Sequence, residues 1–150
     1  MGVKEKICKH QRIMFDSSPV IYFIEEHPIY GAITDEIFKV IKDNRDVHAF
    51  SSAITLIEVL THPLRDSDEE LAGRYREFLI RSANFTIYDI EPMIGEQAAK
   101  LRAKYGIRTP DAIQLAVGIG NGGTLFVTND KRLKKIKEMK IMVLEDYLTV

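Results

Sequence analysis

The chain has 150 residues, of which 45% are hydrophobic and 29% are charged, and its formal net charge is −1. This composition is ordinary for a soluble globular domain. No apolar run approaches the roughly 20 residues that span a bilayer, so we expect no membrane segment. The length predicts a single domain over residues 1–150, and we expect it to be cytoplasmic because one cysteine allows no internal disulfide.

Short β-like runs alternate with helical patterns along the chain. Strands are predicted at residues 12–15, 47–51, 85–88, 124–128 and 141–144, and helices at 19–26, 33–41, 53–60, 68–81, 93–105 and 110–119. We expect the helix at 53–60 to end before Pro63 and the helix at 93–105 to stop at Gly106. This alternation predicts an α/β fold with a mostly parallel sheet covered by helices on both faces.

Residues 1–11 precede the first predicted strand and form a basic N-terminal extension with Lys4, Lys6 and Lys9. No long apolar segment follows, so we do not expect the extension to act as a secretory signal. Two further basic clusters lie at residues 100–108 and 131–140. They fit a polyanionic partner, and the alternative is a solvated helix face.

Four carboxylates stand where an ordinary folding role explains them poorly: Asp16, Glu58, Asp111 and Asp130. Asp16 and Asp130 follow the first and fourth predicted strands. Sites in open parallel sheets form at the carboxyl ends of strands where the strand order reverses, so these two acids converge if their strands are neighbours there. Converging carboxylates repel one another unless a hard divalent cation neutralises them. We therefore predict a metal-dependent phosphoryl-transfer or hydrolytic site.

Two of the acids have helix capping as the alternative role. Asp16 could cap the helix that follows it, although Ser18-Pro19 already offers a favourable N-cap and first helical residue. Asp130 could cap a turn into the basic segment after it, a role that Thr128 or Asn129 could also fill.

The other two acids also have local alternatives. Glu58 fits a capping box with Thr55 if its helix starts late; otherwise it lies among aliphatic neighbours, where burial without a partner costs several kcal/mol. Asp111 would favour the dipole of a helix that Thr109 caps and Pro110 begins.

Other chemistry finds little support in the chain. The four histidines have no metal-ligand spacing, and Cys8 has no activating base near it in sequence. The glycine-rich residues 118–123 end a helix before a strand, whereas phosphate-binding loops follow a strand and begin a helix.

Four segments together resemble the PIN domain, the nuclease fold of VapC-type toxins. They are residues 13–18 (IMFDSS), 52–60 (SAITLIEVL), 109–116 (TPDAIQLA) and 126–130 (FVTND). The resemblance spans residues 12–147 and departs from the family in the N-terminal extension and in Pro19.

The resemblance implies a three-layer α/β/α sandwich with a five-stranded parallel sheet. It also implies an endoribonuclease that depends on Mg²⁺ or Mn²⁺, with metal bound at the positions of Asp16, Glu58, Asp111 and Asp130. Ser17, Thr128 and Asn129 are expected as polar support for the substrate. Relatives of this type usually form homodimers and are held inactive by a cognate antitoxin.

Rival functions remain open at this point. A PIN protein outside toxin systems could process RNA, and a catalytically silent module could bind RNA or protein. A dehalogenase-like phosphatase would need a second acid at position 18, which is Ser18. A receiver domain would need an acidic pair near Asp16, and that pair is missing.

Overall fold

The computed structural model describes residues 2–148 and contains one five-stranded sheet. Its strands are β1 (Arg12–Phe15), β2 (His48–Ser52), β3 (Phe85–Tyr88), β4 (Leu125–Thr128) and β5 (Lys140–Val143). All neighbouring strands pair in parallel, in the order β3-β2-β1-β4-β5. The order reverses at β1, where Ile13 lies opposite Leu125 of β4. The predicted parallel sheet is therefore confirmed, and the condition under which Asp16 and Asp130 converge, that the first and fourth strands are neighbours, is met.

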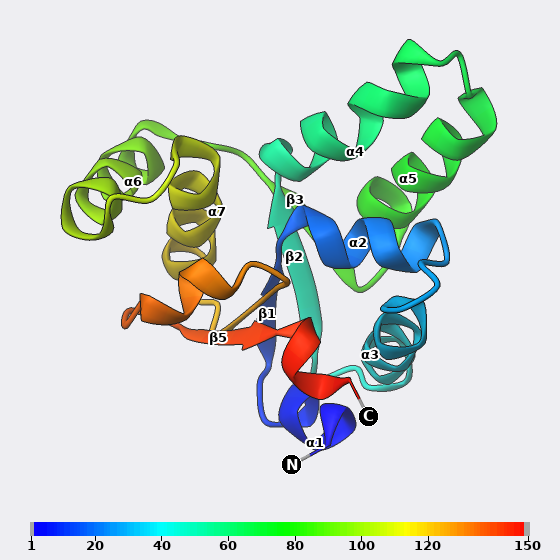
Figure 1. Cartoon of the computed structure of the whole chain (residues 1–150), viewed down its shortest axis with the longest axis horizontal. Helices are drawn as coiled ribbons and strands as arrows, with labels where there is room; N and C mark the ends of the chain where they lie inside the picture. Colours follow the sequence, from blue (N-terminus) through cyan, green and yellow to red (C-terminus); the bar gives the residue numbers. More distant parts are fainter. Residues whose placement is uncertain (1, 149–150) are drawn as a thin grey trace.

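Helices cover both faces of the sheet (Figure 1). One side carries α2 (Ser17–Ile24), α3 (Gly31–Asp43), α4 (Ala53–Arg65) and α5 (Glu69–Arg81), and the other carries α6 (Pro92–Tyr105) and α7 (Thr109–Gly120). Two 3₁₀ helices, η1 (Lys131–Lys135) and η2 (Leu144–Tyr147), flank β5. The three-layer arrangement is as predicted. Among residues 2–148, no helix is long and apolar enough to cross a bilayer.

Alternation along β1 shows why the sheet needs helices on both sides. Ile13 and Phe15 point into the core beneath α2, α3 and α5, and Met14 points into the core beneath α6 and α7. All three side chains are fully buried. Burying a side chain of this size stabilises a fold by roughly 1.5–3 kcal/mol, so each face of β1 contributes to holding one helical layer.

The N-terminal extension packs against the rest of the domain. Residues Val3–Cys8 form a short helix, α1, that lies against α3 (Figure 1). Val3 and Ile7, one helical turn apart, are buried in the same core as β1, whereas Lys4 and Lys9 are exposed. The apolar pair at positions i and i+4 is the signal for this helix.

Most helix boundaries differ from the prediction by one or more residues, and three of the differences have a clear local reason. α2 begins at Ser17 rather than residue 19, so Pro19 is its third residue, where a backbone N–H would have no partner within the helix. α7 begins at Thr109, with Arg108 rather than Thr109 as its N-cap. α4 continues through Pro63 to Arg65, because this buried proline lies in the last turn, where it removes only one helical hydrogen bond. Gly106 ends α6 as predicted, with φ of 66°.

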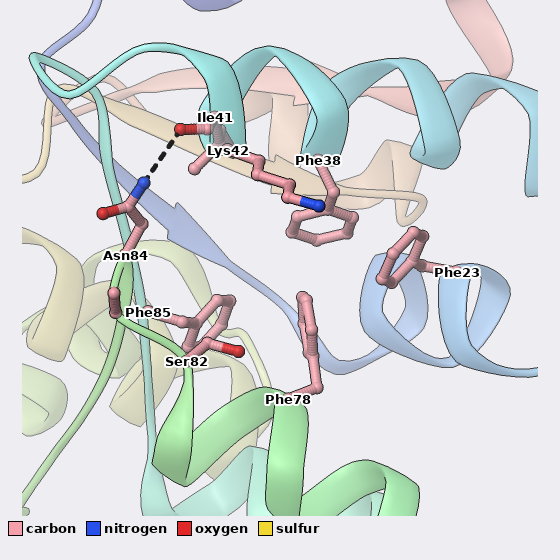
Figure 2. Close-up of a pocket in the computed structure, with 9 residues that line it drawn as sticks. Phe23, Phe38, Ile41, Lys42, Phe78, Ser82, Asn84 and Phe85 are labelled. Atoms are coloured by element: carbon pink, nitrogen blue, oxygen red, sulfur yellow. Dashed lines mark hydrogen bonds between the residues drawn. The ribbon is translucent and has the colours of Figure 1, made fainter.

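An aromatic groove of about 470 Å³ opens between α3, α5 and the start of β3 (Figure 2). Four phenylalanine rings line it: Phe23, Phe38, Phe78 and Phe85. Neighbouring ring centroids are 4.7 Å (Phe23–Phe38), 5.0 Å (Phe38–Phe78) and 5.2 Å (Phe78–Phe85) apart. Lys42, Ser82 and Asn84 form its polar rim.

Candidate active site

A cleft of about 560 Å³ lies at the carboxyl ends of β1 and β4. Its lining includes all seven residues selected from the sequence, namely Asp16, Ser17, Glu58, Asp111, Thr128, Asn129 and Asp130. Arg108 and Lys131 add positive charge to the same walls. The fold thus brings together side chains from four segments that are far apart in the sequence.

Asp16 ends β1 and caps α2, which corrects the expectation that Ser18 would be the cap. One carboxylate oxygen accepts a hydrogen bond from the backbone N–H of Ser17 (2.9 Å), and the other accepts one from the Thr128 hydroxyl (2.8 Å). Burial raises the pKa of Asp16, although the two hydrogen bonds lower it, and the charges of Asp111 and Glu58 raise it further. The carboxylate is therefore held in place by two neutral donors, and no cationic side chain forms an ion pair with it among residues 2–148.

Glu58 projects from α4 into the cleft rather than into the apolar layer. The helix begins at Ala53, and its N-cap is Ser52, whose hydroxyl accepts from Ile54 N–H at 3.1 Å. The capping box with Thr55 therefore does not form. The alternative of a carboxylate buried among aliphatic residues is also wrong, because Glu58 is exposed and accepts a 2.8 Å hydrogen bond from the Ser17 hydroxyl.

Asp111 and Asp130 each face an arginine. Asp111 is 8% exposed in the first turn of α7, with its carboxylate 3.2 Å from Arg108 Nε. Asp130 caps η1 through the backbone N–H of Arg132 (2.9 Å) and also accepts from Nε (3.0 Å) and Nη2 (2.8 Å) of its guanidinium. The hydrogen bonds from Arg132 hold the pKa of Asp130 below its usual range. Capping of the turn after β4 is thus a real role of this acid.

The four acids share a cleft without forming a preassembled metal cage. Among residues 2–148, no group of three or more His, Cys, Asp or Glu side chains is arranged to hold a metal ion. The donor chemistry nevertheless fits Mg²⁺ or Mn²⁺, because these cations take carboxylate oxygens and Mg²⁺ needs only one or two of them beside its waters. Asp16, partly desolvated and surrounded by like charge, is the position where such a cation would relieve most repulsion.

Asn129 has a structural role within the cleft wall. Its amide donates to the Tyr22 hydroxyl (3.2 Å) and accepts from the backbone N–H of Glu145 (3.0 Å). Both ends of the amide are therefore engaged, which ties the loop after β4 to α2 and η2.

Two sets of residues near the acids were not predicted from the sequence as part of the site. Arg108 and Arg132 were noted only as members of basic clusters, although each lies within three residues of the acid that it contacts. Gln114 was given no role, and Thr55 only that of a capping-box partner, whereas the two side chains hydrogen-bond to each other beneath the cleft at 2.7 Å. The available signal was a single glutamine within the apolar run 112–117 of α7.

A family model of the PIN domain matches residues 13–139. The chain belongs to the PIN domain family. The match begins within β1 and ends just before β5, and thus includes all four cleft acids. α1 lies outside it.

Solved structures share the fold of this PIN domain. In VapBC2 from Rickettsia felis bound to promoter DNA, the similar chain has a TM-score of 0.70 and 19% identity, covering 88% of this chain and 98% of that one. The similar chain in DNA-bound VapBC from Salmonella typhimurium has a TM-score of 0.70 and 18% identity, and the match covers 89% of this chain and 98% of that one. Mycobacterium tuberculosis VapC20, a toxin that cleaves the sarcin–ricin loop, has a TM-score of 0.65 and 15% identity, and the match covers 85% of this chain and 98% of that one. No curated protein sequence matches the chain.

Proposed function

We propose that this PIN domain is an endoribonuclease that depends on Mg²⁺ or Mn²⁺ and acts as the toxin of a toxin–antitoxin pair. The observation that carries the proposal is the position of Asp16. Its carboxylate lies at the switch point of the sheet, where burial raises its pKa and the charges of Glu58 and Asp111 raise it further. A divalent cation supplies the positive charge that this arrangement lacks.

The four acids have different roles in binding the cation. Asp16 and Asp130 are the leading direct ligands, and Glu58 and Asp111 bind directly or through water. When bound, the cation lowers the pKa of a coordinated water and offsets negative charge that develops at the scissile phosphate. Thr128 and the Ser17 N–H fix both oxygens of Asp16, so this ligand needs little reorganisation. Asp130 must exchange part of its contact with Arg132.

Positive side chains beside the cleft provide the attraction for a polyanionic substrate. Arg108 and Lys131 line the cleft itself. Lys131 and Lys134 form ion pairs with Glu145 and Asp146, at 2.6 Å each, but both lysines are exposed. Exposed ion pairs contribute little to stability, so these ammonium groups can exchange carboxylates for RNA phosphates at little cost.

Two observations support the proposed toxin role: three of the similar solved structures are toxin–antitoxin complexes, and this chain has the aromatic groove. Two of the similar structures are VapBC complexes, and a third is a toxin–antitoxin complex from Klebsiella pneumoniae. The aromatic groove offers an antitoxin segment a place for an aromatic or aliphatic side chain. Lys42 on its rim would pair with a carboxylate beside that side chain, so we expect an amphipathic, acidic segment as the occupant.

Exposed apolar residues on α4 and α6 favour a homodimer. Ile57 and Leu64 of α4 are 62% and 46% exposed, and Met93 of α6 is 80% exposed. The two α4 residues lie two turns apart on one side of the helix and would be covered by a second copy. Light scattering at micromolar concentration tests this part of the proposal, because a strictly monomeric mass would contradict it.

Cleavage of a mixed RNA pool tests the nuclease proposal. Purified protein, freed of any bound partner, is incubated with tRNA, rRNA and unstructured RNA in Mg²⁺, in Mn²⁺ or in chelator. We expect discrete cuts that require the metal and are absent with Asp16→Asn. Metal-independent cuts that persist in this variant would point to a contaminant, and no cleavage by the folded wild type would favour a binding role.

A further inference from the structure

Beneath the cleft, buried polar side chains connect α7 to the catalytic acids. They come from the start of α2, the end of β2, α4 and α7, and comprise Ser17, Ser51, Ser52, Thr55 and Gln114. Four of them are at most 1% exposed and Ser17 is 6% exposed. Within residues 2–148 no buried side-chain nitrogen or oxygen lacks a hydrogen-bond partner, so this layer is fully satisfied.

The hydrogen bonds follow one another from α7 to Glu58. Ser52 donates to the Gln114 carbonyl oxygen at 2.5 Å, and the Gln114 amide nitrogen donates to the Thr55 hydroxyl at 2.7 Å. The Thr55 and Ser17 hydroxyls are 3.2 Å apart, and Ser17 donates to Glu58 Oε1 at 2.8 Å. We call this sequence of bonds the Gln114 relay.

The chemistry of donors and acceptors fixes the direction of the hydrogen bonds at both ends of the relay. An amide N–H can only donate and an ionised carboxylate can only accept, so the single hydroxyl proton of Ser17 points to Glu58. Thr55 accepts from the Gln114 amide, and its single proton serves the Ser17 oxygen at 3.2 Å and the Ser51 oxygen at 2.7 Å. The Ser51 hydroxyl has its own acceptor in the Phe15 carbonyl oxygen, which lies 2.7 Å away. Bonds aligned in this way polarise and strengthen one another.

Ser17 makes the relay matter for the whole site. Its hydroxyl binds Glu58 and its backbone N–H binds Asp16, so one residue touches two of the four acids. Glu58 is an exposed side chain on a helix surface and would otherwise sample several rotamers. A hydroxyl locked from below by Thr55 and Gln114 keeps its carboxylate turned towards Asp16.

We propose that Gln114 is a positioning residue that sets the orientation of Glu58 for a divalent cation through Thr55 and Ser17. This inference rests on the proposed function, because it requires that Glu58 serve the cation. Partners that orient metal-binding side chains typically change metal affinity 10–100-fold when they are mutated. Gln114 thereby acts on the site from the layer below it, without touching cation or RNA.

Mn²⁺ affinity of the metal-free protein, measured by titration calorimetry without RNA, tests this role. The variant is Gln114→Met, which keeps the length and burial of the side chain but cannot donate to Thr55. The control is Val117→Ala, a fully buried position on the same helix that contacts the apolar core only. We expect Gln114→Met to weaken Mn²⁺ binding about tenfold and Val117→Ala to change it less than twofold, with comparable losses of thermal stability.

Two further variants keep the test decisive if Gln114→Met does not fold. Thr55→Val preserves shape and breaks the relay at its centre, and Ser17→Ala breaks it at Glu58. Each should weaken Mn²⁺ binding as Gln114→Met does. The double variant that combines Gln114→Met with Ser17→Ala should bind Mn²⁺ no more weakly than Ser17→Ala alone, because both substitutions act through one chain of bonds.

The outcomes separate the inference from the function beneath it. Wild-type affinity in Gln114→Met, or additive losses in the double variant, would overturn the positioning role and leave the nuclease proposal intact. Absence of Mn²⁺ binding by wild type would overturn both. Weakened binding in every relay variant, with normal binding in Val117→Ala, is the result that the relay predicts.

Discussion

The hydroxyl of Thr128, at the end of β4, donates a 2.8 Å hydrogen bond to the carboxylate of Asp16, at the end of β1. These two strands are neighbours at the point where the strand order reverses. The bond therefore joins the two strand ends from which the cleft is built. It also leaves the Asp16 carboxylate fixed in place before any cation arrives.

Asp16→Asn should abolish cleavage without unfolding the protein. We expect a rate loss of at least about 100-fold, the usual scale for removing one essential charged or polar group from a site. The thermal midpoint should be unchanged or higher, because asparagine can still cap α2 and the repulsion from Glu58 and Asp111 is removed. Calorimetric unfolding checks this, and a lowered midpoint would mean that the charge of Asp16 is structural.

Arg132→Gln should strengthen metal binding at Asp130. The guanidinium now occupies both carboxylate oxygens, at 3.0 and 2.8 Å, and competes with a cation for them. The arginine is exposed, so we expect a modest gain of about two- to fivefold in Mn²⁺ affinity. Arg76→Gln, which breaks an exposed ion pair with Glu69 on α5, is the matched control. Weaker Mn²⁺ binding in Arg132→Gln would show that this side chain supports the site instead of competing with it.

His48 should make stability depend on pH. Its Nε2 lies 2.7 Å from the Thr86 hydroxyl, and burial, with a smaller effect of the Arg12 charge, lowers its pKa below 6.5. Since the unfolded chain then binds the proton more readily, the contribution of neutral His48 is full above pH 6.5 and is lost as pH falls below it. Wild type should therefore lose more stability than His48→Gln between pH 7.5 and pH 5 in denaturant titrations. Parallel losses would contradict the assignment.

Ile7→Ala tests whether α1 belongs to the core. Ile7 is fully buried among residues of α3 and the sheet. Loss of a buried isoleucine side chain typically costs 2–5 kcal/mol, so we expect the free energy of unfolding to fall by about 3 kcal/mol. Mn²⁺ affinity should be unchanged because α1 lies away from the cleft. A loss below about 0.5 kcal/mol, the usual range for surface changes, would mean that the extension is only loosely attached.

Much of the fold follows from local patterns in the sequence. The strand of residues 12–15 and the strand of residues 85–88 have the predicted bounds, and the remaining strands shift by one residue. Parallel pairing follows from the helices between strands. It places Asp16 and Asp130 at the same end of the sheet, where the strands have their carboxyl ends. Their convergence was predicted only on the condition that the first and fourth strands are neighbours, and the strand order meets that condition.

Features that depend on tertiary contacts escaped prediction. Thr55 and Glu58 look like a capping box, but Ser52 takes the cap, and Thr55 turns inward to meet Gln114, 59 positions along the chain. The side-chain partner of Glu58 is Ser17, 41 positions away. Neither separation leaves a periodic mark in the sequence, so only the folded arrangement reveals the relay.

The most direct test of the proposed chemistry compares cleavage rates of one RNA substrate by wild type, Asp16→Asn and Asp35→Asn in Mn²⁺. Asp35 is an exposed acid on α3 and serves as the matched control, because it leaves the cleft untouched. We predict metal-dependent cleavage by wild type and Asp35→Asn at equal rates and none by Asp16→Asn. Equal cleavage by all three proteins would contradict a catalytic centre at the ends of β1 and β4.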